Sequence, residues 1–258
     1  METLSELWSF LTTESNWWGR RGIVPRTWAH VQISVFSAAV AAAVAIPPAL
    51  FFGHVKRGGL AAVSVVNVGR ALPSFGILAL VLPISIQLGF GLGFWPTAVP
   101  LVLLGVPPIF ANTYTGVRNA EPGVVEAARG MGLSSRQVLT KVEIPLATPL
   151  IITGLRVSTV QIIATATLGA LVGFSALGSF IVEGLASFDN ARMLTGGLIV
   201  ALLAILAEIG FSALERALTP WMRRAGGDPT RRSRLRRGTP EPGPVDQFPL
   251  AGLPGTNP

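Results

Sequence analysis

The chain has 258 residues, of which 50% are hydrophobic and only 13% are charged, and its formal net charge is +7. Soluble domains carry about 25% charged residues, so this composition argues against a soluble enzyme or binding module. The chain contains no cysteine, which excludes disulfides, thiolate metal sites and cysteine nucleophiles.

The apolar residues are gathered into long blocks. Residues 31–52, 71–117 and 157–182 contain no Asp, Glu, Lys, Arg or His. Because a helix needs about 20 apolar residues to cross a bilayer, we expect an all-α membrane protein with about five transmembrane helices.

Residues 1–27 combine tryptophan with arginine, a mixture typical of a segment that lies in the membrane interface. The first span is predicted at 28–52. Its Ala-rich part, 38–45, could imitate the cleavage region of a signal peptide, but the apolar stretch continues to Phe52, so we expect a retained span. The residues that give the first segment this character are Trp8, Trp17, Trp18, Arg20, Arg21 and Arg26.

Further along the chain, Pro73 is expected to kink the second span, and the Gly-rich stretch 89–96 turns the chain back. Residues 174–192 contain Gly178 and Gly184 and are predicted to form a broken or re-entrant segment. The remaining spans are predicted at 60–82, 96–117, 148–172 and 193–216.

The C-terminal residues 219–258 are basic and rich in Pro and Gly, with little apolar surface to pack, so we expect them to be disordered. The arginines of this tail favour a cytoplasmic topology signal over a nucleic-acid partner. We therefore divide the chain into an interfacial segment 1–27, a transmembrane domain 28–218 and the tail.

Basic residues orient the spans. After the first span they fall almost entirely on one side, in the turn near Lys56, in the loop 119–146 and in the tail. By the positive-inside rule this loop and the C-terminus are cytoplasmic and the N-terminus is external.

The loop 119–146 is polar and basic and separates two very apolar halves of the chain. Helical spacing of apolar residues predicts a short amphipathic helix, and Gly132 can adopt the left-handed conformation that ends it. Ser134 and Gln137 form a capping-box pattern that starts a second helix. Pro145 is expected to stop that helix from running straight into the next span. The apolar positions of the first helix are Val124, Val125, Ala128 and Met131.

Catalytic signatures are missing from the sequence. Neither Lys56 nor Lys141 follows a glycine, so no phosphate-binding loop of the Gly-Lys type exists, and any ATPase must be a separate subunit. His30 and His54 have no metal-ligand spacing with acidic neighbours. We expect a chain that is not an enzyme and holds no metal or other cofactor.

Polar residues inside spans are costly and often functional. Arg156 is expected to snorkel or to pair, with Arg70 or with Glu208. For the other polar positions the interpretation stays open between hydrogen bonding across helices and lining of a translocation path. The candidates for the path are Asn112, Tyr114, Gln161 and Thr165.

The sequence of 126–145, EAARGMGLSSRQVLTKVEIP, resembles the EAA loop of permease subunits of binding-protein-dependent ABC importers. The family pattern is EAA, three residues, Gly, nine residues, then aliphatic, any residue, aliphatic and Pro. The resemblance implies the type I importer permease fold with this loop as the cytoplasmic contact to the ATPase. The residues that match the pattern are Glu126, Ala127, Ala128, Gly132, Val142, Ile144 and Pro145.

Four further stretches resemble the osmoprotectant branch of this family, which imports glycine betaine, carnitine or choline. They are VNVGRALPSFGILAL at 66–80, PPIFANTYTGV at 107–117, TATLGALVG at 165–173 and LGSFIVEGL at 177–185. One departure is Phe174, which stands where the branch often has a Gly-rich run.

The resemblance implies a bacterial plasma-membrane subunit that forms the translocation path with a second permease copy or a paralogous permease. Its further partners would be ABC ATPase subunits, which hold the ATP and magnesium, an extracytoplasmic substrate-binding protein, and the lipid bilayer. Two alternatives stay open: a permease for another small solute, such as an amino acid or a sulfonate, and a passive channel or membrane scaffold.

Overall fold

The computed structural model describes residues 2–56, 64 and 73–220. Within these ranges the chain forms helices joined by short turns, and no strand occurs there. The chain divides into two compact units, Met1–Leu218 and Thr219–Pro258. The disorder predicted for the tail concerns residues that, apart from Thr219 and Pro220, lie outside the described ranges.

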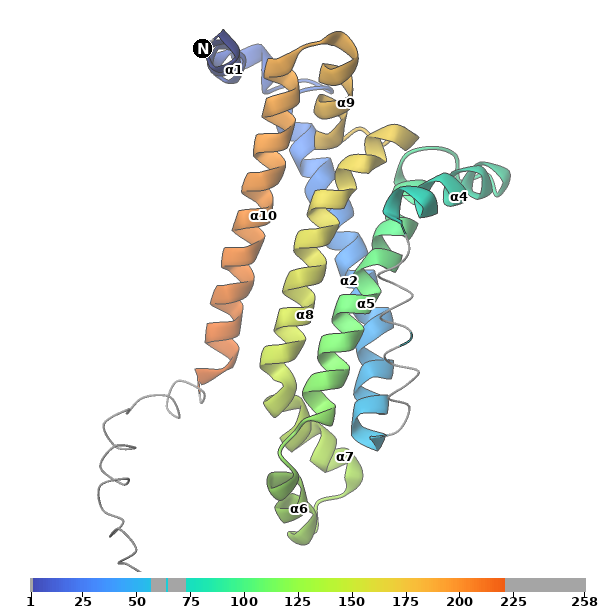
Figure 1. Cartoon of the computed structure of the whole chain (residues 1–258), viewed down its shortest axis with the longest axis vertical. Coiled ribbons are helices and arrows are strands. Elements are labelled where there is room, and N and C mark those ends of the chain that lie inside the picture. The colour runs from blue at the N-terminus through green and yellow to red at the C-terminus, as the bar shows by residue number, and fades with distance from the viewer. Residues whose placement is uncertain (1, 57–63, 65–72, 221–258) are drawn as a thin grey trace, which may run out of the picture. The chain divides into compact units, whose positions relative to one another are not determined.

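Four long apolar helices dominate the first unit (Figure 1). They confirm the first, third, fourth and fifth predicted spans, with ends that differ by a few residues. Each is long and apolar enough to cross a membrane, the third one when it is counted with its helical extensions as Ser135–Val172. The four helices are α2 (Ile23–Val55), α5 (Phe94–Arg118), α8 (Ile144–Thr165) and α10 (Asn190–Leu218).

Most of the second predicted span, 60–82, lies outside the described residues. Its described part begins the short helix α4 (Ser74–Gln87), and Pro73 is the residue that precedes this helix. A proline suits this position because it has no backbone N–H to leave unpaired. The chain then turns at 89–93, as predicted, through three glycines with positive φ angles, Gly89 (79°), Gly91 (71°) and Gly93 (89°).

Small residues allow α5 to pack closely against both α2 and α8. Gly105 of α5 lies where an added Cβ would come within 2.8 Å of the Ser158 Oγ atom on α8 and 3.0 Å of the Ala41 Cβ atom on α2. On α2, Ala41, Ala45 and Ala49 recur at every fourth position and are fully or almost fully buried against α5. Close approach through small residues is the usual way in which membrane helices associate.

The segment between α8 and α10 is broken, as predicted. The α8 helix tightens into the 3₁₀ helix η3 (Ala166–Val172), and the short helix α9 (Leu177–Ser187) then returns against it. An added Cβ at Gly178 would lie 2.0 Å from the Thr167 carbonyl oxygen, so only glycine allows this contact. Phe174 is half-buried and packs on Phe94, with ring centroids 6.3 Å apart.

The N-terminal segment contains the helix α1 (Glu2–Thr12) and the 3₁₀ turn η1 (Glu14–Asn16), and α2 begins at Ile23. Phe10 contacts Phe180 of α9 edge to face at 6.4 Å. Figure 1 shows α1 and α9 at one end of the helices and the loop between α5 and α8 at the other.

Candidate functional site

The loop between α5 and α8 folds into two short helices, α6 (Pro122–Gly130) and α7 (Ser135–Val138), which we call the knob together with the turn that joins them. Gly132 has φ of +84°, as predicted. The Leu133 amide donates to the Ala128 carbonyl (3.2 Å) and the Gly132 amide to the Arg129 carbonyl (2.9 Å). These two bonds are the Schellman motif that ends a helix.

The second helix of the knob starts with the predicted capping box. The Gln137 amide donates to the Ser134 hydroxyl, and the Ser134 amide donates to the Gln137 side-chain oxygen at 2.8 Å. Both ends of the turn are therefore satisfied by local hydrogen bonds.

A small hydrophobic core holds the two helices of the knob together. Val138 is fully buried, and Val125 and Ala128 are nearly so. Leu133 and Val142 pack on this core from the turn and from the helix that follows α7. Of the EAA residues, Ala128 therefore has a structural role, which its helical spacing predicted.

The outer side of the knob is apolar but exposed. Val124 is 41% and Met131 75% exposed, and Ala127 and Glu126 are also exposed. Val124, Ala127 and Met131 are spaced by three and four residues, so they form one stripe on the helix surface. Of the four apolar positions in the predicted helical spacing, Val125 and Ala128 are therefore buried, whereas Val124 and Met131 are exposed.

The expectation that Pro145 separates the knob from the next span is wrong. After α7 the chain passes through a π-helical turn, η2 (Leu139–Glu143), and continues directly into α8. Pro145 lies in the first turn of α8. A proline cannot donate a hydrogen bond and its ring crowds the carbonyl four residues earlier; the wider π-helical turn lies just where that carbonyl would be. Ile144, the first residue of α8, is half-buried.

A buried carboxylate anchors the knob to α2. Glu143 is completely buried, and its Oε2 atom lies 2.5 Å from Nδ1 of His54, in the last turn of α2. The Nε2 atom of the same imidazole lies 2.6 Å from the Ser135 hydroxyl at the start of α7. The His54 side chain of α2 thus contacts both the start of α7, at Ser135, and the residue just before α8, Glu143. Sequence reasoning missed both His54 and Glu143, because the loop pattern accepts any residue at position 143.

The four candidate path residues do not face a common space. Asn112 is half-buried where α5 contacts α8, and its Cβ atom lies next to Gly154. Its side-chain amide nitrogen donates to the Pro108 carbonyl within α5 (2.8 Å). Tyr114 is buried towards α2, with its ring parallel to that of Phe110 at 6.2 Å. On α8, Gln161 is exposed and Thr165 is half-buried.

Two ion-pair groups tie spans together. Arg156 of α8 is 3.3 Å from Glu208 of α10, the pairing that we considered together with snorkelling, and it also donates to the Ser212 hydroxyl (3.3 Å). Arg70 lies outside the described residues. The other group joins Arg26 of α2 to Glu183 of α9 at 2.7 Å, and sequence reasoning did not find it. Over the described part of the chain, no set of three His, Cys, Asp or Glu side chains could hold a metal ion.

Comparison with known proteins agrees with this architecture. The choline transport system permease protein OpuBB of Bacillus subtilis (strain 168) is 34% identical over 195 residues, which cover 76% of this chain and 88% of the relative. The glycine betaine/carnitine/choline transport system permease protein OpuCB of the same organism is 32% identical over 217 residues, covering 84% and 95%. The carnitine transport permease protein OpuCB of Listeria monocytogenes is 34% identical over 198 residues, covering 77% and 88%.

Solved structures show the same fold. An inward-facing structure of the MetNI methionine ABC transporter matches with a TM-score of 0.66 at 21% identity, over 76% of this chain and 96% of that chain. An amino acid ABC transporter crystallised with histidines matches with a TM-score of 0.57 at 18% identity, over 77% and 92%. Residues 34–224 match the family described as binding-protein-dependent transport system inner membrane component. The chain is therefore a multi-pass membrane protein that belongs to the family of inner membrane components of binding-protein-dependent transport systems.

Proposed function

We propose that this chain forms the translocation path of an ABC importer for osmoprotectants such as glycine betaine. The observation that carries the substrate class is the set of relatives, which are permeases for choline, carnitine or glycine betaine. The NTYTG sequence at 112–116 and the other stretches that resemble the osmoprotectant branch support it independently of the loop.

The knob is proposed as the surface that an ABC ATPase subunit grips. Its exposed stripe of Val124, Ala127 and Met131 offers apolar area to a partner groove, and Glu126 and Arg129 add charge beside it. Gly132 shapes the turn, while Val142, Ile144 and Pro145 join the knob to α8. ATP and magnesium would be held by the ATPase, so this chain contributes motion and no catalytic group.

The path itself is proposed to lie between two permease chains, this one and either a second copy or a paralogue. Gln161, exposed on α8, is the best placed of the four candidates, and Thr165 lies one helical turn further along α8. Asn112 lies at the contact between α5 and α8, next to Gly154. Tyr114 is packed in the core and would reach a path only in a conformation in which α2 and α5 separate.

In the membrane, we propose that the knob and the C-terminus are cytoplasmic and that the N-terminal segment and α9 face the external binding protein. The basic residues Arg129 and Arg136 of the knob and Lys141 of the π-helical turn after it support this orientation. The same proposal keeps 28–218 as the transmembrane domain, 1–27 as an interfacial segment and 219–258 as a separate tail.

Uptake of labelled glycine betaine tests the proposal. The host would lack its own osmolyte importers and produce this chain with its cognate ATPase and binding protein. ATP-dependent uptake that choline or carnitine competes for is the expected result. An assembled complex that imports an amino acid or a sulfonate instead, and no osmoprotectant, would overturn the substrate class. Flux without ATP would identify a passive channel.

A further inference from the structure

A cavity of about 530 Å³ lies at the end of the helices opposite the knob, between the N-terminal segment and the α9–α10 corner. Four arginine side chains line it, and among the described residues Glu183 is the one that contributes a carboxylate to its wall. We call it the arginine cavity. Its arginines are Arg20, Arg21, Arg26 and Arg192.

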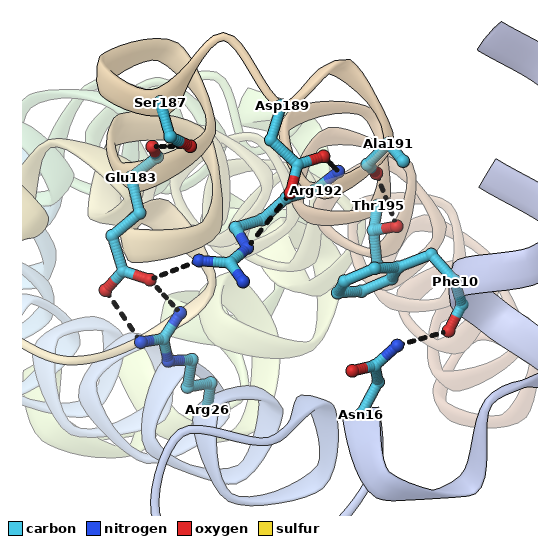
Figure 2. A network of polar contacts seen from close by, with 9 residues as sticks. All are labelled: Phe10, Asn16, Arg26, Glu183, Ser187, Asp189, Ala191, Arg192 and Thr195. Carbon is cyan, nitrogen blue, oxygen red and sulfur yellow. Dashed lines mark hydrogen bonds and ion pairs between the residues drawn. The ribbon is translucent and has the colours of Figure 1, made fainter. Parts of the chain in front are cut away.

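Two of these arginines are fixed in place by the contacts in Figure 2. The guanidinium group of Arg26 donates to both oxygens of Glu183, at 3.1 and 2.7 Å, and its central carbon lies 4.4 Å from the centroid of the Phe180 ring. Arg26 is only 2% exposed, and its Nε atom has no hydrogen-bond partner among the described residues. The Arg26 guanidinium group is therefore held in one orientation in the wall of the cavity, with its Nε–H left unpaired.

Glu183 must serve a second cation as well, since its Oε2 atom is 3.7 Å from Arg192. Asp189 assists from the turn before α10, with a carboxylate oxygen 3.6 Å from the Nε atom of Arg192. These two carboxylates balance Arg26 and Arg192. The charges of the other two arginines of the cavity are not balanced by them.

Arg20 and Arg21 are exposed and have no acidic partner within the described ranges. Gly22, which follows them, caps α2 and also lines the cavity. The Val24 amide in the first turn of α2 already donates to the Trp17 carbonyl (3.1 Å), so the positive charge of the wall comes from the guanidinium groups. The wall is built to receive an anion with several acceptor oxygens, for which arginine forks are well shaped.

The surroundings of the cavity indicate where the anion comes from. Trp18 lines it and is 63% exposed, and Trp28, less than two turns into α2, is also 63% exposed. Exposed tryptophans beside the start of an apolar span are typical of the boundary between headgroups and acyl chains. We propose that the arginine cavity binds the phosphate of an anionic phospholipid headgroup, with the acyl chains running along the exposed apolar face of α2.

Lipid binding to the purified full chain in detergent, measured by native mass spectrometry, tests the proposal. Phosphatidylglycerol should bind in preference to phosphatidylcholine. The double variant Arg20→Ala/Arg21→Ala removes only exposed side chains and should weaken phosphatidylglycerol binding by about tenfold or more, because the headgroup phosphate loses its charge-assisted hydrogen bonds to two guanidinium groups. The matched control is Arg129→Ala/Arg136→Ala, which removes the same charge from the knob and should leave this binding unchanged.

Three results would overturn the proposal. The first is unchanged phosphatidylglycerol binding in the Arg20/Arg21 variant. The second is equal protection of the chain against heat by inorganic phosphate and by phosphatidylglycerol, which would make the cavity a site for free anions. In the third, the variant keeps the lipid but loses affinity for the external binding protein, so the arginines dock a protein. Arg21→Gln is a milder variant for the same readout should the double variant fold poorly. The inference does not depend on which solute is imported.

Discussion

Gly132 is the position in the knob where a single added methyl group is expected to matter most. Its φ of +84° is strained for any L side chain, yet an added Cβ would meet no atom within 4 Å. The whole cost of Gly132→Ala is therefore a backbone cost of about 1–2 kcal/mol. This corresponds to a roughly 5- to 30-fold increase in the equilibrium for opening the turn. Gly132→Val should cost more, because β-branched residues tolerate positive φ least.

Hydrogen exchange of the knob amides measures this opening directly. The Gly132 and Leu133 amides are bonded to carbonyls of α6, and they should exchange faster by that factor in Gly132→Ala. Gly130→Ala is the matched control: Gly130 is helical, and its added Cβ also meets nothing. In a helix, Ala is favoured over Gly by about 1 kcal/mol, so exchange in this control should be unchanged or slower.

Transport should follow the same order. Gly132→Val is expected to abolish uptake while the chain still inserts into the membrane, because the knob no longer presents its stripe to the ATPase. The reasoning is refuted if Gly132→Val exchanges and transports like the wild type, or if Gly130→Ala is as damaging as Gly132→Ala.

Three more perturbations follow from the packing. His54→Ala leaves buried Glu143 without its bonded partner and should lower stability by about 1–3 kcal/mol or more; an unchanged melting temperature of the purified chain would contradict it. Gly105→Val forces a side chain into contacts below 3 Å and should destabilise the protein by about 1–3 kcal/mol or more. Gly197→Val, with open space around its added Cβ, is the control and should not destabilise it. Equal shifts in melting temperature for the two variants would show that the helices around α5 move apart to accept the side chain. Truncation after Ala225 should preserve uptake, because the removed sequence offers little apolar surface; loss of uptake at normal protein levels would show a partner or regulatory role.

The parts of the fold that could be predicted are those with local causes. The turn at Gly132 and the capping box of Ser134 and Gln137 depend on residues at most five positions apart, and both appear as expected. Apolar length alone located four spans, although α2 starts at residue 23 instead of 28. Which residues of the knob are exposed was harder to predict from the sequence, because Met131 shares the helical spacing of the buried residues and is nevertheless 75% exposed.

The parts that could not be predicted depend on distant partners. His54 and Glu143 are 89 positions apart, and Arg26 and Glu183 are 157 apart. The sequence around each of these four residues contains nothing that indicates its distant partner. The continuity through Pro145 was missed because a proline near a helix start is read as a stop, and a π-helical turn leaves no simple sequence signal.

The absence of a break at Pro145 has a mechanical consequence. From Ser135 to Val172 the chain stays helical, through α7, the π-helical turn η2, α8 and the 3₁₀ helix η3. Its regular part, α8, has 22 residues and is about 33 Å long at 1.5 Å per residue, so a tilt of about 5° at one end displaces the other by about 3 Å. A hinge at position 145 would have absorbed a tilt of that size. Under the proposed function, a helix that continues through this position would carry a rocking movement of the knob directly into the membrane-spanning part of the chain.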